Sequence, residues 1–156
     1  MIIIKIDKSF DNSQITMSEP ETSITLNQWQ QLTRQGNMCF HANSPAKATQ
    51  LYQQALALAL QAYAEESVEP TLFGASLLSV IASYHNLAEV FEQQNKPQDA
   101  LFHLAAADEF VLSEIEKFKA DARLIYLLKA RNKTLLALNL HAKQHPNSHK
   151  QKESTP

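Results

Sequence analysis

The sequence predicts an all-α fold of about five antiparallel helices. Only two glycines occur in 156 residues, against an average usage of about 7%, and alanine, leucine and glutamine, which favour helix, are abundant. Runs of β-branched residues are confined to the start of the chain. Between about residues 29 and 110 the sequence also contains two similar units, which align without a gap at a spacing of 52 residues.

The repeat pairs positions of matching size class, which is the signature of stacked structural units. The pairs are Leu32 with Tyr84, Gly36 with Ala88, Cys39 with Phe91, Asn43 with Asn95, Pro45 with Pro97, Ala48 with Ala100, Tyr52 with Leu104 and Ala55 with Ala107. Large and small residues spaced three or four apart share one helix face. Asn-Ser-Pro and Asn-Lys-Pro stand where each unit should turn, so each unit is predicted to be a helix hairpin.

Five helices follow from this pattern in chain order. The predicted ranges are 26–42, 45–66, 71–94, 97–118 and 122–144. Thr25 and Gln28 offer a capping box for the first helix. Pro70 and Thr71 open the third, and Pro146 follows the fifth. The fifth helix corresponds to the first half of a third unit and would cap the stack.

The chain is therefore predicted to contain one helical domain with two non-helical ends. Residues 1–24 lack helical periodicity and are expected to form an extended or mobile arm. Residues 25–144 form the helical repeat domain, and residues 145–156 are a polar, disordered tail.

The repeat resembles the tetratricopeptide repeat, whose signature runs large, small, large, turn, alanine, aromatic, alanine. The second unit matches in Tyr84, Leu87, Ala88, Phe91 and Ala100, whereas the first departs at Gln35 and Cys39. The spacing exceeds the usual 34 residues. The resemblance therefore implies a long-helix variant, with two repeats and a C-terminal capping helix arranged as a right-handed α-α superhelix.

In that family the first helix of each hairpin lines a concave groove that binds polypeptides. The corresponding positions here are Thr33, Arg34, Asn37, His41, His85, Asn86, Glu89 and Gln93. Asn37 and Asn86 match asparagines that hold a peptide backbone in some relatives, and an amide can donate and accept at once. The alternative is that both asparagines are exposed residues typical of the repeat and bind no peptide. Thr33 replaces a lysine needed to grip a C-terminal carboxylate, so that clamp is expected to be absent.

The resemblance implies a non-catalytic protein–protein interaction module, an adaptor or scaffold that binds a peptide or a partner helix. The alternative is a small chaperone of the same fold for a secreted or assembly-prone protein. A homodimer is a further option if Leu60, Leu77 and Leu78 are exposed. Neither an enzymatic activity nor a cofactor is expected, because the sequence contains no phosphate loop or triad motif.

Composition limits the other partners and the location. The net charge is −2 without a dense basic face, which argues against nucleic acid. The apolar opening Met1–Ile4 is too short for a membrane span. Cys39 has no second cysteine to pair with, which fits a reducing compartment, and a cytoplasmic location is expected.

The histidines are the main candidates for metal binding. His141, His145 and His149 recur every four residues, a spacing that lets two histidines share one ion on a helix. However, Pro146 interrupts the run, and no Cys, Asp or Glu stands nearby in the sequence. A solvated tail without metal is therefore predicted. His41, His85 and His103 are expected to be structural, and Cys39 to act as a small hydrophobe.

Overall fold

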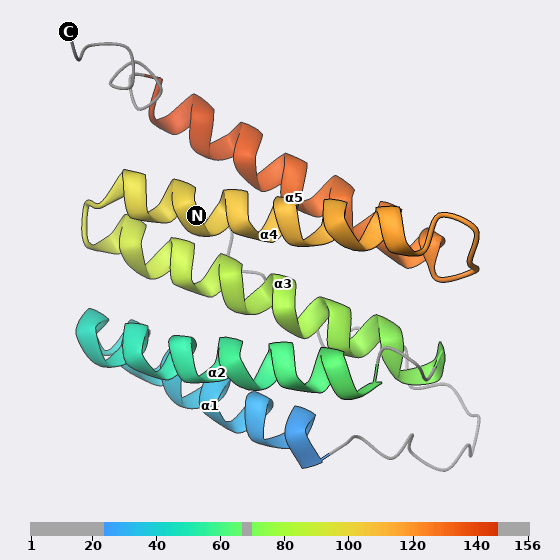
Figure 1. The fold of residues 1–156 in the computed structure, drawn as a ribbon. Helices are drawn as coiled ribbons and strands as arrows, with labels where there is room; N and C mark the ends of the chain where they lie inside the picture. Colours follow the sequence, from blue (N-terminus) through green and yellow to red (C-terminus); the bar gives the residue numbers. More distant parts are fainter. Residues whose placement is uncertain (1–23, 67–69, 147–156) are drawn as a thin grey trace, which may run out of the picture.

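The computed structural model describes residues 24–66 and 70–146, which form five α-helices and no strand (Figure 1). The helices are α1 (Ile24–His41), α2 (Pro45–Glu66), α3 (Pro70–Gln93), α4 (Pro97–Lys117) and α5 (Leu124–Gln144). The predicted all-α fold class is confirmed, and the predicted helix ends lie within two residues of the observed ones. The predicted arm, apart from Ile24, and the tail beyond residue 146 lie outside the described residues.

Two helix starts differ from the prediction for identifiable reasons. Helix α1 already begins at Ile24, and the Thr25 hydroxyl donates to Glu65 Oε2 on α2 at 3.1 Å. The predicted capping box is therefore wrong. Helix α5 begins later than predicted because Asp121 accepts hydrogen bonds from the Arg123 backbone N–H at 2.8 Å and from its guanidinium, which holds these residues in a turn.

Both hairpin turns have the same backbone geometry. Asn43 and Asn95 have φ of 55°, in the left-handed region that asparagine tolerates better than most residues. Ser44 N–H donates to Cys39 C=O at 2.9 Å, and Lys96 N–H donates to the carbonyl of Phe91 at 2.9 Å. These bonds close a Schellman motif at the end of α1 and α3. Proline then starts the next helix in each case, so the repeat in sequence is a repeat in structure.

Within each hairpin, residue size is balanced across the helix crossing. A Cβ added to Gly36 would lie 2.5 Å from Cε1 of Tyr52, so the tyrosine ring occupies the space above the glycine. In the second hairpin, Ala88 and Leu104 hold the equivalent positions and belong to one buried cluster. In each hairpin a small residue on the first helix faces a larger residue on the second helix. This match of sizes lets the two helices of each hairpin pack at short distance.

The helices form two layers whose spacing differs. Helix α3 contacts both α1 and α5, whereas no Cα of α2 lies within 8 Å of a Cα of α4 in these described helices. The side chain of Tyr63 bridges α2 and α4: its ring packs edge-on against Phe110, and its hydroxyl donates to Glu114 Oε2 at 2.8 Å. We call α1, α3 and α5 the inner layer. Because the helices of this layer approach one another more closely than α2 and α4 do, the stack curves and its inner face is concave.

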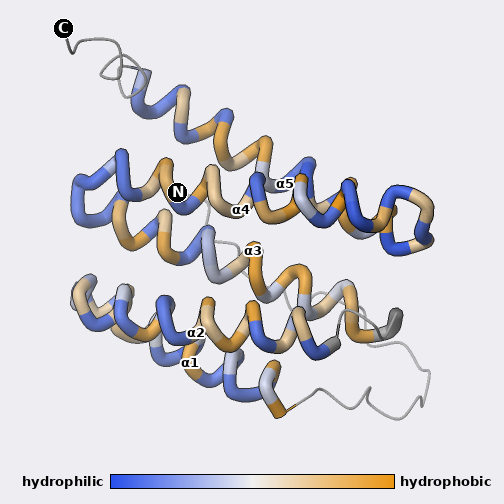
Figure 2. The backbone as a smooth tube through the Cα atoms, viewed as in Figure 1, coloured by the Kyte–Doolittle hydropathy of each residue, from blue (hydrophilic) through white to orange (hydrophobic). Residues whose placement is uncertain are grey.

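The main hydrophobic core lies between the layers and centres on α3. Phe73, Leu77, Val80 and Ile81 are all at most 2% exposed. Figure 2 shows hydrophobic and hydrophilic positions alternating along each helix, as one buried face requires. Leu77 is thus part of the core, because α3 is the middle helix and is covered by its neighbours, so it cannot contribute to an exposed apolar patch for a homodimer. Leu78, by contrast, is 46% exposed.

Buried polar side chains tie neighbouring helices together. Trp29 Nε1 on α1 donates to Ser83 Oγ on α3 at 2.8 Å, and the Thr134 hydroxyl on α5 donates to the buried Asp108 carboxylate on α4 at 2.6 Å. Each bond satisfies a group that would be costly to bury alone. None of the described helices is long and apolar enough to cross a membrane.

The Gly36–Tyr52 contact predicts strong coupling between these two positions. Gly36→Ala should destabilise the fold by about 1 kcal/mol, because overpacking of about 1–3 kcal/mol exceeds the gain of about 1 kcal/mol in helix propensity. Adding Tyr52→Leu recreates the Ala88–Leu104 pair and should relieve the strain. A double-mutant cycle by urea denaturation should give a coupling energy of about 1 kcal/mol or more.

Gly74→Ala is the matched control for this cycle. Its added Cβ would lie 3.3 Å from the ring of Tyr126, which is 48% exposed and free to shift. This change should be neutral or stabilising by up to about 1 kcal/mol. Additive effects of Gly36→Ala and Tyr52→Leu would contradict the proposed contact.

Candidate functional site

A cleft of about 770 Å³ opens along the inner layer of the stack. Helices α1, α3 and α5 supply most of its lining, and α4 contributes Leu104. The lining residues are Phe40, His41, His85, Ala88, Glu89, Glu92, Gln93, Leu104, Lys133, Leu136, Ala137, Leu140, His141 and Gln144. The volume lies within the range of ligand-binding pockets, about 300–1,000 Å³. The cleft is the concave face that the curvature of the stack creates.

The cleft combines apolar and polar walls. Ala88 is 3% exposed and Leu104 is 8% exposed, so they form a largely buried apolar surface at the junction of α3 and α4. Leu136, at 58% exposed, offers apolar area from α5. Polar and charged side chains stand around these residues, mainly from α3 and α5. An occupant would therefore meet apolar contacts and hydrogen-bonding groups at once.

Half of the predicted groove residues line this cleft. His41, His85, Glu89 and Gln93 do, whereas Thr33, Arg34, Asn37 and Asn86 are not among its lining residues. The structure thus brings together one residue at the end of α1, His41, with three residues of α3. The other four lie elsewhere on α1 and α3.

Asn37 has a structural partner that the sequence did not reveal. Its Oδ1 accepts a hydrogen bond of 2.7 Å from the hydroxyl of Tyr52. Burial raises the pKa of Tyr52 to about 12, so the hydroxyl keeps its proton and remains a donor at neutral pH. This bond helps hold the Tyr52 ring over Gly36 and explains the asparagine within the fold.

Sequence reasoning missed the contribution of α5, although a signal was present. The 52-residue spacing relates His85 to Ala137 and Glu89 to His141, and both of these α5 residues line the cleft. Helix α5 therefore contributes to the lining of the cleft at the positions that the 52-residue spacing relates to His85 and Glu89.

Four residues that line the cleft have buried polar atoms without a hydrogen-bond partner in the described structure: His85 Nε2, Glu89 Oε1, Glu92 Oε1 and both ring nitrogens of His141. Burial, with a smaller effect of Lys133, lowers the pKa of His85 to about 4, and burial raises the pKa of Glu89. His85 is therefore neutral at pH 7, when one ring nitrogen donates and the other accepts. Such groups favour a ligand that brings its own donors and acceptors.

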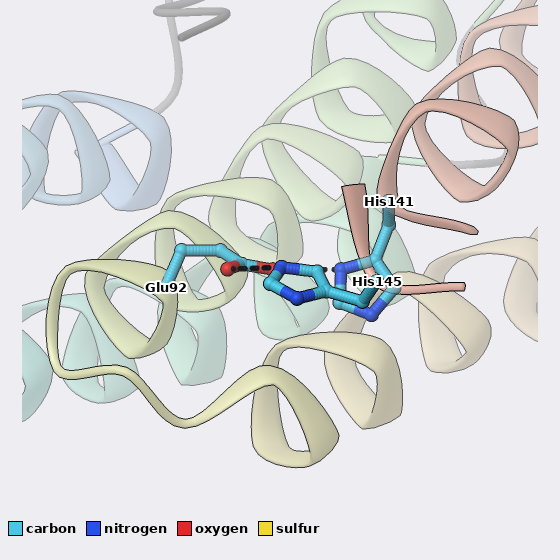
Figure 3. Close-up of side chains that lie close together, drawn as sticks. All are labelled: Glu92, His141 and His145. Carbon is cyan, nitrogen blue, oxygen red and sulfur yellow. Dashed lines mark hydrogen bonds and ion pairs between the residues drawn. The ribbon is translucent and has the colours of Figure 1, made fainter. Parts of the chain in front are cut away.

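At one end of the cleft, Glu92 on α3 meets His141 and His145 from the end of α5 (Figure 3). His145 Nε2 lies 2.9 Å from Glu92 Oε2 in a hydrogen bond, and His141 Nδ1 lies 2.7 Å from Glu92 Oε1. The sequence suggested that no carboxylate accompanies these histidines, and the structure corrects this, because α3 brings one from 49 residues away in the chain. His149 lies outside the described residues.

A family model described as a protein of unknown function, DUF2753, matches residues 27–155. The chain belongs to the DUF2753 family. No curated protein and no solved structure matches it. The matched segment of this DUF2753 protein includes every residue that lines the cleft.

The lowered pKa of His85 predicts a pH-dependent contribution to stability. A histidine in the unfolded chain takes up a proton near pH 6.5, whereas the folded His85 does so only near pH 4. Between these two pH values the unfolded state binds more protons than the folded state. The free energy of unfolding therefore decreases as the pH falls from about 6.5 to 4.

The test compares wild type with His85→Gln by urea denaturation at several pH values. The free energy of unfolding of wild type minus that of His85→Gln should be constant above about pH 7. At pH 4 this difference should be lower by about 1–3 kcal/mol. A difference that stays constant over the whole range would contradict the burial of a neutral His85.

Proposed function

We propose that this DUF2753 protein is a non-catalytic protein-interaction module that holds a segment of a partner polypeptide in its concave cleft. The observation that carries the proposal is the lining of the cleft, in which a buried apolar surface from Ala88 and Leu104 lies alongside buried polar atoms without partners, His85 Nε2 and Glu89 Oε1. A polypeptide offers both apolar side chains and regularly spaced backbone donors and acceptors. It can therefore satisfy both features together.

The proposal includes a tetratricopeptide-like architecture. Its support is the equivalence of the two hairpins, with the same left-handed asparagine in each turn and the same small-on-large contact between helices. The position of the cleft also agrees, since it lies on the first helices of the successive hairpins. In this fold an extended peptide or an amphipathic helix can lie along such a groove.

A binding role accounts for the polar residues of the cleft without a reaction. The free thiol of Cys39 packs beside a buried cluster of Ala48, Tyr52, Leu87 and Val90 and does not line the cleft. His103 stacks on Phe91 with ring planes 8° apart and is likewise outside the lining. The proposed setting is a reducing compartment such as the cytoplasm, where Cys39 stays a thiol.

The exposed apolar residues of α5 favour a second candidate, a small chaperone. Four large apolar side chains of this helix, outside the cleft, are 38–53% exposed: Ile125, Tyr126, Leu128 and Leu135. Such a surface suits a client with extensive apolar area, and equally a second copy of the chain. A chaperone would keep an assembly-prone client soluble, whereas an adaptor would bind a short segment of a folded partner.

The proposal predicts that bound peptides depend on the cleft and not on other exposed apolar residues. Peptides are selected from a displayed random library against the full chain, and their affinities are measured by fluorescence anisotropy. Leu136→Glu should weaken binding at least about tenfold, because it places a charge against the apolar side of the bound segment.

Phe102→Glu is the matched control. Phe102 lies on α4, is 68% exposed and does not line the cleft, so the same change of chemistry should leave binding unaltered. Equal losses in the two variants, or no selected peptides at all, would contradict the proposed function. Selected peptides that lose affinity only in Phe102→Glu would place the binding surface on the outer layer.

A further inference from the structure

We propose that Glu92, His141 and His145 form a binding site for one divalent transition-metal ion of the Zn²⁺ type. The site joins the C-terminal end of α5 to α3 at one end of the cleft (Figure 3). This inference does not depend on the proposed function, because it rests on the geometry of three side chains.

The three side chains already converge on one point. Each can offer one ligand atom, and these atoms all lie within 4.8 Å of one another. The two imidazole rings are 4.7 Å apart between centroids, and the Glu92 carboxylate faces both of them, as Figure 3 shows. Bonds of about 2.0–2.1 Å to a tetrahedral ion would set the ligand atoms about 3.3 Å apart. The 2.7 Å and 2.9 Å separations, which join His141 and His145 to the two different oxygens of Glu92, need to open by about half an ångström. The widest separation among the ligand atoms, at most 4.8 Å, needs to close by up to about 1.5 Å.

His141 has the strongest reason to bind an ion. It is 3% exposed, and neither of its ring nitrogens has a hydrogen-bond partner in the described part of the chain. Nδ1 lies 2.7 Å from Glu92 Oε1, but the two atoms do not meet with hydrogen-bond alignment, and Oε1 also lacks such a partner. A buried polar atom in this state is costly. An ion between Nδ1 and Oε1 would coordinate both.

The ligand types select the class of ion. Imidazole nitrogen suits Zn²⁺ and its transition-metal neighbours, and two histidines with one glutamate form a known zinc set. Mg²⁺ and Ca²⁺ prefer shells of oxygen ligands, which this site does not offer. Each nitrogen binds unprotonated, so a proton on it moves to the other ring nitrogen or to water. Three protein ligands leave a fourth position for water.

A metal here would fix the position of α5. His145 is the C-cap residue of that helix, and Glu92 lies in the last turn of α3. An ion shared by both would hold the end of α5 against the inner layer and set the width of the cleft at that end. Ion binding to the folded state also raises thermal stability, because the unfolded chain does not hold the three ligands together.

The test uses the full chain without an affinity tag, stripped of metal with a chelator. Zn²⁺ stoichiometry is measured by equilibrium dialysis and affinity by competition with a coloured chelator, while Co²⁺ reports tetrahedral coordination by its visible absorption. Wild type should bind one Zn²⁺ per chain. Glu92→Gln and His145→Ala should each weaken binding by about 100-fold or more, since losing even an indirect partner of a zinc ligand costs 10–100-fold.

Two matched controls share the cleft but not the site. Glu89→Gln changes a carboxylate one turn away on α3, and His41→Ala removes an exposed histidine of α1; both should bind Zn²⁺ like wild type. Less than one Zn²⁺ per chain in wild type, or undiminished binding in Glu92→Gln, would overturn the proposal. Circular dichroism of Glu92→Gln, which preserves side-chain size, confirms that lost binding is not lost folding.

Discussion

The close approach of α3 to both α1 and α5 is the constraint on which the rest of the structure depends. Backbones within the inner layer contact one another, whereas α2 and α4 stay apart and are bridged by Tyr63. A stack with one tight and one open layer must curve toward the tight side. The cleft is therefore a consequence of how the hairpins pack, and residues distant in sequence, such as Glu92 and His141, meet at its end.

Residue size and buried polar bonds together maintain that arrangement. Gly36 makes room for the ring of Tyr52, and the equivalent pair in the second hairpin uses alanine and leucine. The bonds Trp29–Ser83 and Thr134–Asp108 then fix α1 and α5 to their neighbours. The walls of the cleft are thus held by the core, while His85 Nε2 and Glu89 Oε1 on those walls have no hydrogen-bond partner in the described structure.

The fold could be predicted almost entirely, because its determinants are local or periodic. The asparagine–proline turns and the 52-residue repeat locate four helices, and the same spacing extends to α5. The site could be predicted only in part. His41, His85, Glu89 and Gln93 follow from the repeat, but the bond from Tyr52 to Asn37 depends on a hydroxyl crossing between helices. The contact of Glu92 with two histidines depends on the curvature of the helix stack, which cannot be predicted from residue spacing in the sequence.

The central claim is that the concave cleft receives a polypeptide, and methyl chemical-shift mapping tests it most directly. The chain, labelled at alanine and leucine methyl groups, is titrated with a peptide that binds it. The account predicts that the largest shifts arise at Ala88, Leu104, Ala137 and Leu140, which line the cleft. Shifts confined to the outer face of α5, at Leu128 and Leu135, with the cleft methyls unmoved, would contradict it.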